Sequence, residues 1–184
     1  AALVPNVMSG ELNAAVIHLP IDEPELVVEP LFAEDLLLLV DESHRLAGSD
    51  TIGIDELHEE PLLLPPTGSA MRKLLDRAWA ANDVALRAQA ESDGVRLLAA
   101  MALDGFGPAI VPATAIPTWL TGSFRRVNVP ELPRRVVATV RKRRPNPGAP
   151  THVALEALRS VIDEQGEQQP GVHPDTAALS SGRS

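Results

Sequence analysis

The sequence predicts an α/β fold in which strands alternate with helices and each sheet is covered on both faces. The clearest observation is the stretch 92–112, where a helical pattern, a glycine-flanked turn and a short apolar strand follow one another. A second observation is the run 36–40, which is nearly all leucine and therefore typical of a central, fully buried strand. A third is an apolar content of 45% with mixed charge, which is ordinary for a globular protein.

The first half of the chain is predicted to form four strands and one helix. Short apolar runs that stop at turn residues or proline indicate strands at residues 14–19, 26–28, 36–40 and 62–64. The loop 65–69 then leads into a helix predicted over residues 70–82. Its apolar side chains recur on one helical face: Met71, Leu74, Leu75, Ala78 and Trp79.

The middle of the chain carries the second predicted helix. Residues 86–91 alternate as in a strand, and the Ser92 hydroxyl can accept hydrogen bonds from the first turn of the following helix. Leu97, Leu98, Met101 and Ala102 are predicted to form its buried face. Glycines on either side of Phe106 then favour an abrupt exit into the buried strand 109–111, which Pro112 ends.

The last part of the chain is predicted to contain two strands, one helix and a tail. The strands cover residues 124–129 and 136–140, and Thr151 is expected to cap the helix. The apolar face of this helix comprises Val153, Leu155, Leu158, Val161 and Ile162. From residue 166 onward Gly, Pro, Gln and Ser dominate, so residues 166–184 are predicted to be a disordered tail.

Charge and composition restrict the function. The net charge of −9 argues against direct DNA binding by this chain, because DNA is a dense polyanion. The absence of cysteine excludes thiol catalysis, disulfides and cysteine metal sites, and fits a cytoplasmic protein. No apolar run approaches the roughly 20 residues that cross a bilayer, and no signal-peptide pattern is present, so no membrane partner is expected.

Basic residues gather late in the chain, at Arg134, Arg135 and residues 141–144. Such a cluster invites a nucleic-acid interpretation. However, the residues between these positions resemble a strand, and no aromatic side chain is interleaved for base stacking. We favour a solvated strand end that faces acidic neighbours, since residues 1–60 are rich in carboxylates.

Thr67, Gly68 and Ser69 are the leading candidates for a binding site. They lie between a predicted buried strand and a helix start, where free backbone donors and two hydroxyls suit a carboxylate or a similar anion. The structural alternative is that Ser69 only caps the helix and that the loop is a connector.

Other candidates are His18, Phe106, Gly107 and Pro108. His18 ends the first strand, where it either bonds a backbone carbonyl or offers a titratable ligand contact. Phe106 and Pro108 are candidates for the apolar wall of a cleft, although Phe106 is an equally good core residue. Ser92 and Asp93 share the helix-start position, and for both we favour capping.

Motifs for catalysis, metal binding and nucleotide binding are absent from the sequence. The histidines show no metal-site spacing, and His58 is followed by Glu59, Glu60 and Pro61 rather than by an HExxH pattern. No phosphate loop with lysine and no Gly-x-Ser-x-Gly elbow occurs, and residues 105–107 follow a helix rather than opening one. No cofactor, metal or catalytic residue is therefore predicted.

The order of segments resembles the effector-binding domain of LysR-type transcriptional regulators. Residues 98–112 resemble its "lV-aaG-lGia-lLP" signature and residues 10–14 its "G-x-L-D-a" step. Residues 30–46 resemble "pL-x-e-x-lvlv-p-x-HPL". Later strand and helix segments follow in the family's order over about residues 9–164. The sequence departs from the family pattern at Asn13, Arg45 and Pro108.

The resemblance implies a fold like that of type 2 periplasmic binding proteins, with two lobes of mixed sheet joined by crossover strands. The first lobe would comprise residues 1–34 and 141–165 and the second lobe residues 35–140. The family begins with a winged helix-turn-helix domain and a first β-α unit. These are expected to be missing here, which would leave the chain truncated at its N-terminus and its first lobe incomplete.

The resemblance also implies a function. We expect a regulatory domain that senses a small-molecule effector between its lobes, forms homo-oligomers, and reaches DNA only through the missing winged helix-turn-helix. The effector site would include His18, residues 67–69 and residues 106–108. The alternative is a solute-binding protein of a transport system with the same fold, and an enzyme is not expected.

Overall fold

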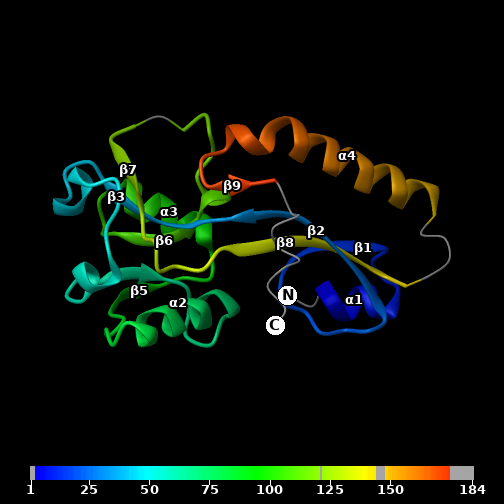
Figure 1. Ribbon diagram of the computed structural model, residues 1–184, viewed down its shortest axis with the longest axis horizontal. Helices are drawn as coiled ribbons and strands as arrows, with labels where there is room; N and C mark the ends of the chain where they lie inside the picture. The colour runs from blue at the N-terminus through cyan, green and yellow to red at the C-terminus, as the bar shows by residue number, and fades with distance from the viewer. Residues whose placement is uncertain (1–2, 121, 144–147, 175–184) are drawn as a thin grey trace. The chain divides into compact units, whose positions relative to one another are not determined.

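The computed structural model describes residues 3–120, 122–143 and 148–174. The chain divides into two compact units, which we call unit 1 (Ala1–Glu34 and Arg135–Ser184) and unit 2 (Asp35–Arg134). Each unit combines a sheet with helices, as the ribbon shows (Figure 1). The predicted α/β class is therefore confirmed.

Unit 2 contains a mixed sheet whose strand order is β5-β4-β6-β3-β7 among the described residues. Strand β4 is parallel to β5 and β6, whereas β3 is antiparallel to β6 and β7. The strands are β3 (Leu36–Asp41), β4 (Leu62–Leu64), β5 (Ala88–Glu91), β6 (Ala109–Pro112) and β7 (Phe124–Asn128).

Both faces of this sheet are buried. Successive side chains of a strand point to opposite faces, so the residues of β3 divide between two clusters. Leu36, Leu38 and Val40 of β3 pack in a cluster that includes Trp79 of helix α2 (Ala70–Ala81). Leu39 packs on the other face, in a cluster that includes helix α3 (Val95–Leu103). Helices α2 and α3 therefore cover opposite faces of the sheet, which explains why residues 36–40 of β3 are all apolar.

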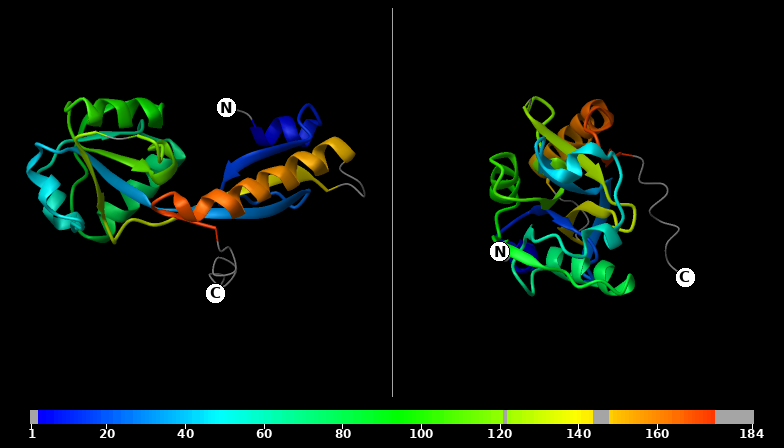
Figure 2. Two further views of the ribbon diagram at one scale, coloured as in Figure 1. Left: turned by 90° about the horizontal axis from the view of Figure 1, so that it is seen from above. Right: turned by 90° about the vertical axis from the view of Figure 1, so that its left-hand side faces the viewer.

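Unit 1 contains an antiparallel sheet in the strand order β1-β8-β2-β9 among the described residues. Figures 1 and 2 show helix α1 (Leu3–Ser9) on one side of this sheet and helix α4 (Ala149–Gln165) on the other. The strands are β1 (Ala14–His18), β2 (Leu26–Glu34), β8 (Arg135–Lys142) and β9 (Val172–His173).

The two sides of the unit 1 sheet are stabilised differently. On the α1 side, Val7, Leu26 and Val140 form a small buried apolar cluster. Helix α4 has no fully buried residue, and Arg159 of this helix pairs with Glu29 of β2. Glu29 also pairs with Arg141, at 3.5 Å. Charged contacts thus contribute to the α4 side, where apolar burial is limited.

The ends and faces of two helices differ from the sequence predictions. Helix α3 has Gly94 rather than Ser92 at its N-cap, and it buries Leu98, Ala99 and Ala102 while Leu97 is 55% exposed. Helix α4 begins at Ala149, so Thr151 lies inside the helix and does not cap it. Its Val153 and Val161 are exposed. Apolar spacing alone did not fix which helical face is covered.

Two boundaries also differ from the expectation. Strand β8, which we expected mostly in the second lobe, pairs with β1 and β2 in unit 1. The predicted disordered tail contains a 3-10 turn at Gly166–Gln168 and strand β9, which pairs with β2. Residues 175–184 of the predicted tail lie outside the described residues.

Candidate functional site

The parallel strands of unit 2 all begin at one end of its sheet and all end at the other. Strands β4, β5 and β6 point the same way, so their last residues lie at one end and their first residues at the other. We call the end with Leu64 and Glu91 the carboxyl edge, and the end with Leu62 and Ala88 the amino edge. In open α/β sheets, ligands bind beyond the carboxyl ends of strands.

The loop 65–69 emerges at the carboxyl edge, between β4 and α2. Ser69 is the N-cap of α2, and its Oγ accepts a hydrogen bond from the backbone N–H of Arg72, at 3.1 Å. The Ser69 N–H donates to the carbonyl of Pro66, at 3.1 Å. Gly68 has a φ of +86°, which suits glycine because it has no Cβ. The capping role considered from the sequence is therefore present.

Thr67 is held by a carboxylate of the chain itself. Its backbone N–H donates to Glu91 Oε2 at 3.2 Å, and its Oγ1 donates to Glu91 Oε1 at 3.0 Å. Glu91 is the last residue of β5, next to Leu64 in the sheet. Two of the donors that we expected to be free for an anion, both on Thr67, are therefore engaged by a side chain from the neighbouring strand.

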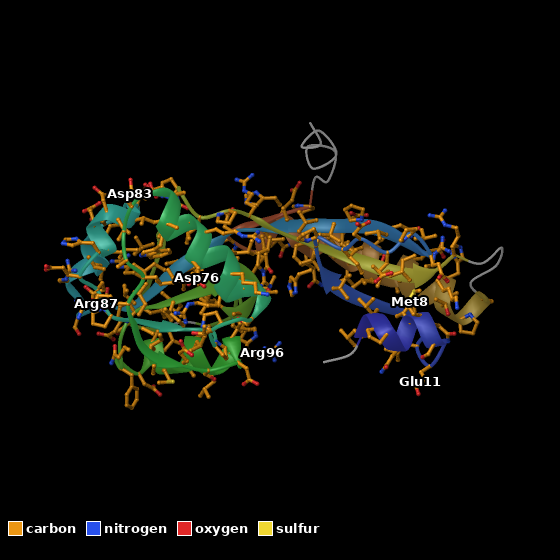
Figure 3. The ribbon with its side chains drawn as sticks, turned by 90° about the horizontal axis from the view of Figure 1, so that it is seen from below. Met8, Glu11, Asp76, Asp83, Arg87 and Arg96 are labelled. Carbon is orange, nitrogen blue, oxygen red and sulfur yellow. The ribbon has the colours of Figure 1, made fainter. Side chains whose placement is uncertain are left out.

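Arg72 completes this cluster from the first turn of α2. Its Nη1 donates to Glu91 Oε1 at 2.6 Å and to the Pro65 carbonyl at 3.2 Å. Its Nε donates to Asp76, which is labelled in Figure 3, at 2.9 Å. Hydrogen bonds from Arg72 and then from Thr67 lower the pKa of Glu91. Burial alone would lower the pKa of Arg72. Hydrogen bonds to Glu91 and Asp76 outweigh this effect, so the pKa of Arg72 is raised.

Phe106, Gly107 and Pro108 lie at the amino edge, directly before β6. The Pro108 carbonyl accepts from the N–H of Leu63 at 2.8 Å, and Pro108 is buried. Phe106 is 62% exposed, so it is not a core residue. Gly107 has a φ of +145°, a backbone conformation that other residues rarely adopt, which explains glycine at this position. Thr67–Ser69 and Phe106–Pro108 are thus at opposite edges of the sheet.

The amino edge also holds a second carboxylate cluster. Glu60 pairs with Arg45, and its Oε1 lies 3.3 Å from His44 Nε2. His44 Nδ1 accepts from the N–H of Leu46 at 3.3 Å. Next to His44 is a cavity of about 60 Å³ that Gly107 also lines. This volume is far below the roughly 300–1,000 Å³ of small-molecule sites, so an organic ligand does not fit there.

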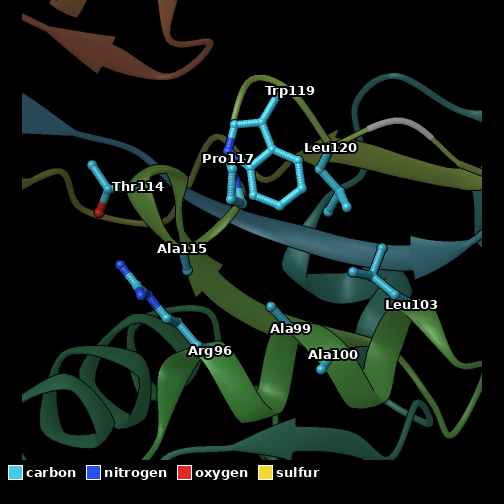
Figure 4. A pocket seen from close by; sticks show the side chains of 9 residues that line it. All are labelled: Arg96, Ala99, Ala100, Leu103, Thr114, Ala115, Pro117, Trp119 and Leu120. Carbon is cyan, nitrogen blue, oxygen red and sulfur yellow. The ribbon is translucent and has the colours of Figure 1, made fainter.

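A larger pocket of about 570 Å³ runs along α3 from the carboxyl edge. Figure 4 shows the indole of Trp119 opposite Ala99 and Leu103 of α3, with Arg96 and Thr114 at one end. Arg96 belongs to the first turn of α3, and Thr114 follows β6. No ion pair of Arg96 is recorded within residues 3–120, 122–143 and 148–174. The pocket therefore combines apolar walls with an available cation.

His18 belongs to unit 1 and to a different polar cluster. Its Nε2 contacts the guanidinium of Arg135 and lies 3.6 Å from Glu34 Oε1. Glu34 is fully buried and bonds Arg135 at 2.8 Å. The His18 side chain is 51% exposed. The ring therefore contacts a buried ion pair on one side and solvent on the other.

Sequence reasoning missed Glu91 and Arg72. The two residues are 19 positions apart and carry no motif, so only the β4–β5 pairing brings them together. Of the seven predicted site residues, the structure groups Thr67, Gly68 and Ser69 in one loop and Phe106, Gly107 and Pro108 in another. Arg96, Thr114 and Trp119 were not predicted either, although a tryptophan outside every predicted helix and strand was a usable signal.

Metal sites and membrane spans have no candidates among the described residues. No group of three or more His, Asp or Glu side chains within the described ranges is arranged to hold a metal ion. In the same part of the chain, no helix has both the length and the apolar character needed to cross a membrane.

Three of the late basic residues pair with carboxylates in the first part of the chain, whereas Lys142 and Arg143 donate to the backbone carbonyls of Met8 and Leu26. Arg134 bonds Asp35 at 2.8 Å, Arg135 bonds Glu34, and Arg141 bonds Glu29. Arg144 lies outside the described residues. These ion pairs are what the interpretation as a strand end facing acidic neighbours requires.

Comparison with known proteins establishes the family. The family model described as the LysR substrate binding domain matches residues 1–176. The chain therefore belongs to the family of LysR substrate-binding domains. The resemblance found in the sequence is confirmed, and with it the class of fold.

Individual relatives are named as gene activators or transcriptional regulators. A probable hydrogen peroxide-inducible genes activator from Streptomyces viridosporus is 28% identical over 169 residues, which cover 89% of this chain and 53% of the relative. The regulator TtuA from Agrobacterium vitis is 30% identical over 184 residues, which cover 90% of this chain and 57% of TtuA. The chain thus spans about half the length of the curated relatives it matches.

A solved structure gives the same fold. The regulatory domain of CcmR from Synechocystis PCC6803, in complex with 2-PG, superposes with a TM-score of 0.74 at 19% identity. The match covers 86% of this chain and 77% of the CcmR chain. Because the relatives are regulators, the alternative of a transport solute-binding protein finds no support.

Proposed function

We propose that this chain senses a small organic effector at the carboxyl edge of unit 2 and so controls a LysR-type transcriptional regulator. The observation that carries the proposal is a pocket of about 570 Å³ that Arg96 lines, at the same edge of the sheet as the hydrogen-bonded pair Thr67 and Glu91. That volume lies within the usual range for small-molecule sites, and apolar walls with few polar groups are typical of them.

The wider role follows from the family. Two relatives are named as an HTH-type or a DNA-binding transcriptional regulator, and this chain spans about half of their length. We propose that DNA binding belongs to a segment outside these residues, that the protein acts as a homo-oligomer in the cytoplasm, and that the domain binds its effector without chemical conversion. A binding step that shifts a conformational equilibrium is sufficient for such control.

Peroxide sensing through thiols is not available to these residues. One relative is named as a hydrogen peroxide-inducible genes activator. Reversible oxidation to sulfenic acid or a disulfide requires cysteine, and this chain has none. The similarity to that activator therefore supports the fold and the regulatory role, and we propose a bound effector as the signal.

The experiment is a melting-temperature screen of the chain against organic acids, amino acids, amines and polyols. A ligand that binds only the folded chain at about 100 times its Kd stabilises it by about 2.7 kcal/mol, which is a measurable shift. We expect at least one saturable hit, confirmed by isothermal titration calorimetry. A broad panel without any shift would contradict effector sensing by this chain.

Variants then locate the site. Arg96→Ala should weaken the hit by about tenfold, the loss expected for one polar contact to a ligand. Phe106→Ala is the matched control, because it removes an exposed side chain at the amino edge and should leave the affinity unchanged. Weakening by Phe106→Ala alone would move the site to the amino edge and contradict the proposal.

A further inference from the structure

The Glu91 carboxylate occupies the position that an anionic ligand would take at the loop 65–69. It accepts hydrogen bonds from the Thr67 N–H at 3.2 Å and the Thr67 hydroxyl at 3.0 Å, and a charged bond from Arg72 at 2.6 Å. These are the kinds of donor that proteins use to bind carboxylates and phosphates. The loop therefore already holds an anion, which the chain itself supplies.

A second anion at this loop meets the negative charge of Glu91 and finds the donors of Thr67 already engaged. The Arg72 guanidinium is shared between Glu91, Asp76 and the Pro65 carbonyl, and both hydrogen-bond donors of Thr67 are used by Glu91. A ligand carboxylate beside Glu91 would place two like charges together, which disfavours binding. The sequence prediction of a carboxylate ligand assumed that these donors were free.

Glu91 can still accept a hydrogen bond from outside the protein. A carboxylate has about four lone-pair positions, and the chain fills three of those of Glu91. The Glu91 side chain is 36% exposed, whereas that of Arg72 is 11% exposed. The group offered to solvent at this loop is therefore an acceptor with negative charge, while the neutralising cation lies behind it.

We propose that Glu91 is a specificity-determining residue, which makes the loop accept a hydroxyl or ammonium group of the effector and reject carboxylate and phosphate groups. This inference rests on the proposed function, because it assigns the chemistry of the group that faces this loop. The opposite possibility is that an anionic effector displaces Glu91 from Thr67 and Arg72, and the experiment separates the two.

The test uses small probes, so it does not require the effector to be known. Backbone amide NMR signals of residues 67–69 are followed while sodium acetate or methylammonium chloride is added at constant ionic strength. In the wild-type chain, methylammonium should give a saturable shift at these amides and acetate should not. A saturable acetate shift in the wild-type chain would overturn the proposal.

Two variants sharpen the result. Glu91→Gln keeps the size of the side chain and removes its charge, so acetate should bind at residues 67–69 about tenfold more tightly than in the wild-type chain. Glu59→Gln is the control, because it neutralises a 78% exposed carboxylate outside the loop and should leave acetate binding unchanged. An unchanged response of Glu91→Gln would also overturn the proposal.

Failure of this inference is distinguishable from failure of the proposed function. If Glu91→Gln does not fold, Glu91→Thr provides a second neutral side chain, and the wild-type comparison of the two probes stands without any variant. An empty melting-temperature screen contradicts effector sensing whatever the probes do. Acetate binding to the wild-type loop contradicts only the role assigned to Glu91.

Discussion

The two edges of the unit 2 sheet both hold a glutamate paired with an arginine, yet they differ in what they leave exposed. At the amino edge the Glu60 side chain is 11% exposed and is enclosed by His44 and Arg45. At the carboxyl edge the arginine is the buried partner and the glutamate is the exposed one, since Arg72 is 11% exposed and Glu91 is 36% exposed. The Glu60 cluster buries its carboxylate, whereas the Glu91 cluster presents a hydrogen-bond acceptor to solvent.

The cavities follow the same division. The amino edge has a space of about 60 Å³, and the pocket of about 570 Å³ begins at the carboxyl edge. Parallel strands place the following loops and helix starts at their carboxyl ends, so backbone donors and polar side chains gather there. An Arg–Glu pair therefore indicates a binding site only where one of its side chains is exposed to a ligand.

The largest effect is expected from the strand that supports both edges. Leu63 of β4 is fully buried and packs against the α3 side of the sheet. Leu63→Ala should lower the free energy of unfolding by about 2–5 kcal/mol, because it leaves a cavity in the core. Urea denaturation measures this change. Leu97→Ala, at a position 55% exposed, is the control and should cost much less.

A smaller loss is expected at the amino edge. Glu60→Gln removes the charge that Arg45 and His44 share, and should cost about 1.5 kcal/mol, at the low end for charged hydrogen bonds because the Arg45 side chain is 59% exposed. Urea denaturation again gives the value. Ligand affinity should not change, and a loss of ligand affinity in this variant would break the distinction between the edges.

The helix cap at the carboxyl edge should contribute about as much or slightly less. Ser69→Ala removes the acceptor for the Arg72 N–H and should cost about 1 kcal/mol, as N-cap losses usually do. Ser69→Asp keeps an accepting oxygen and should stay near the wild-type stability. If both variants were equally destabilised, the hydrogen bond from Arg72 would not be the reason for serine at this position.

The smallest effect is a dependence on pH. The pKa of Glu91 is lowered by Arg72 and Thr67, so its ionised form contributes stability above the ordinary glutamate pKa of about 4.3. This contribution is lost as the pH falls through the lowered pKa of the folded state. Melting temperatures of the wild-type chain and Glu91→Gln should differ at neutral pH and converge in acid. A difference that grows in acid would contradict the sign.

The sequence was sufficient to predict the elements that a local pattern of apolar residues defines. Residues 36–40 are apolar at every position because β3 is buried on both faces, and helix α2 repeats its apolar residues over three turns. Helix α3 is shorter and apolar almost all round, so the spacing did not tell Leu97, which is exposed, from Ala99, which is buried. The resemblance supplied the fold class that periodicity left open.

The site was harder to predict because it depends on contacts between distant segments. Thr67–Ser69 was found from the strand-to-helix junction, which is a local pattern. The occupation of Thr67 by Glu91 depends on the pairing of β4 with β5, which no local pattern encodes. Phe106–Pro108 was predicted as a cleft wall and was grouped with that loop in one effector site. The parallel direction of β4 and β6 places it at the other edge.

Amide hydrogen exchange of the chain, with and without the tightest ligand from the melting-temperature screen, tests the account most directly. We predict that the ligand slows exchange at residues 65–72 and 92–97, at the carboxyl edge, and leaves residues 41–48 and 105–108 unchanged. Protection confined to residues 41–48 and 105–108 would contradict the assignment of the effector site to the carboxyl edge.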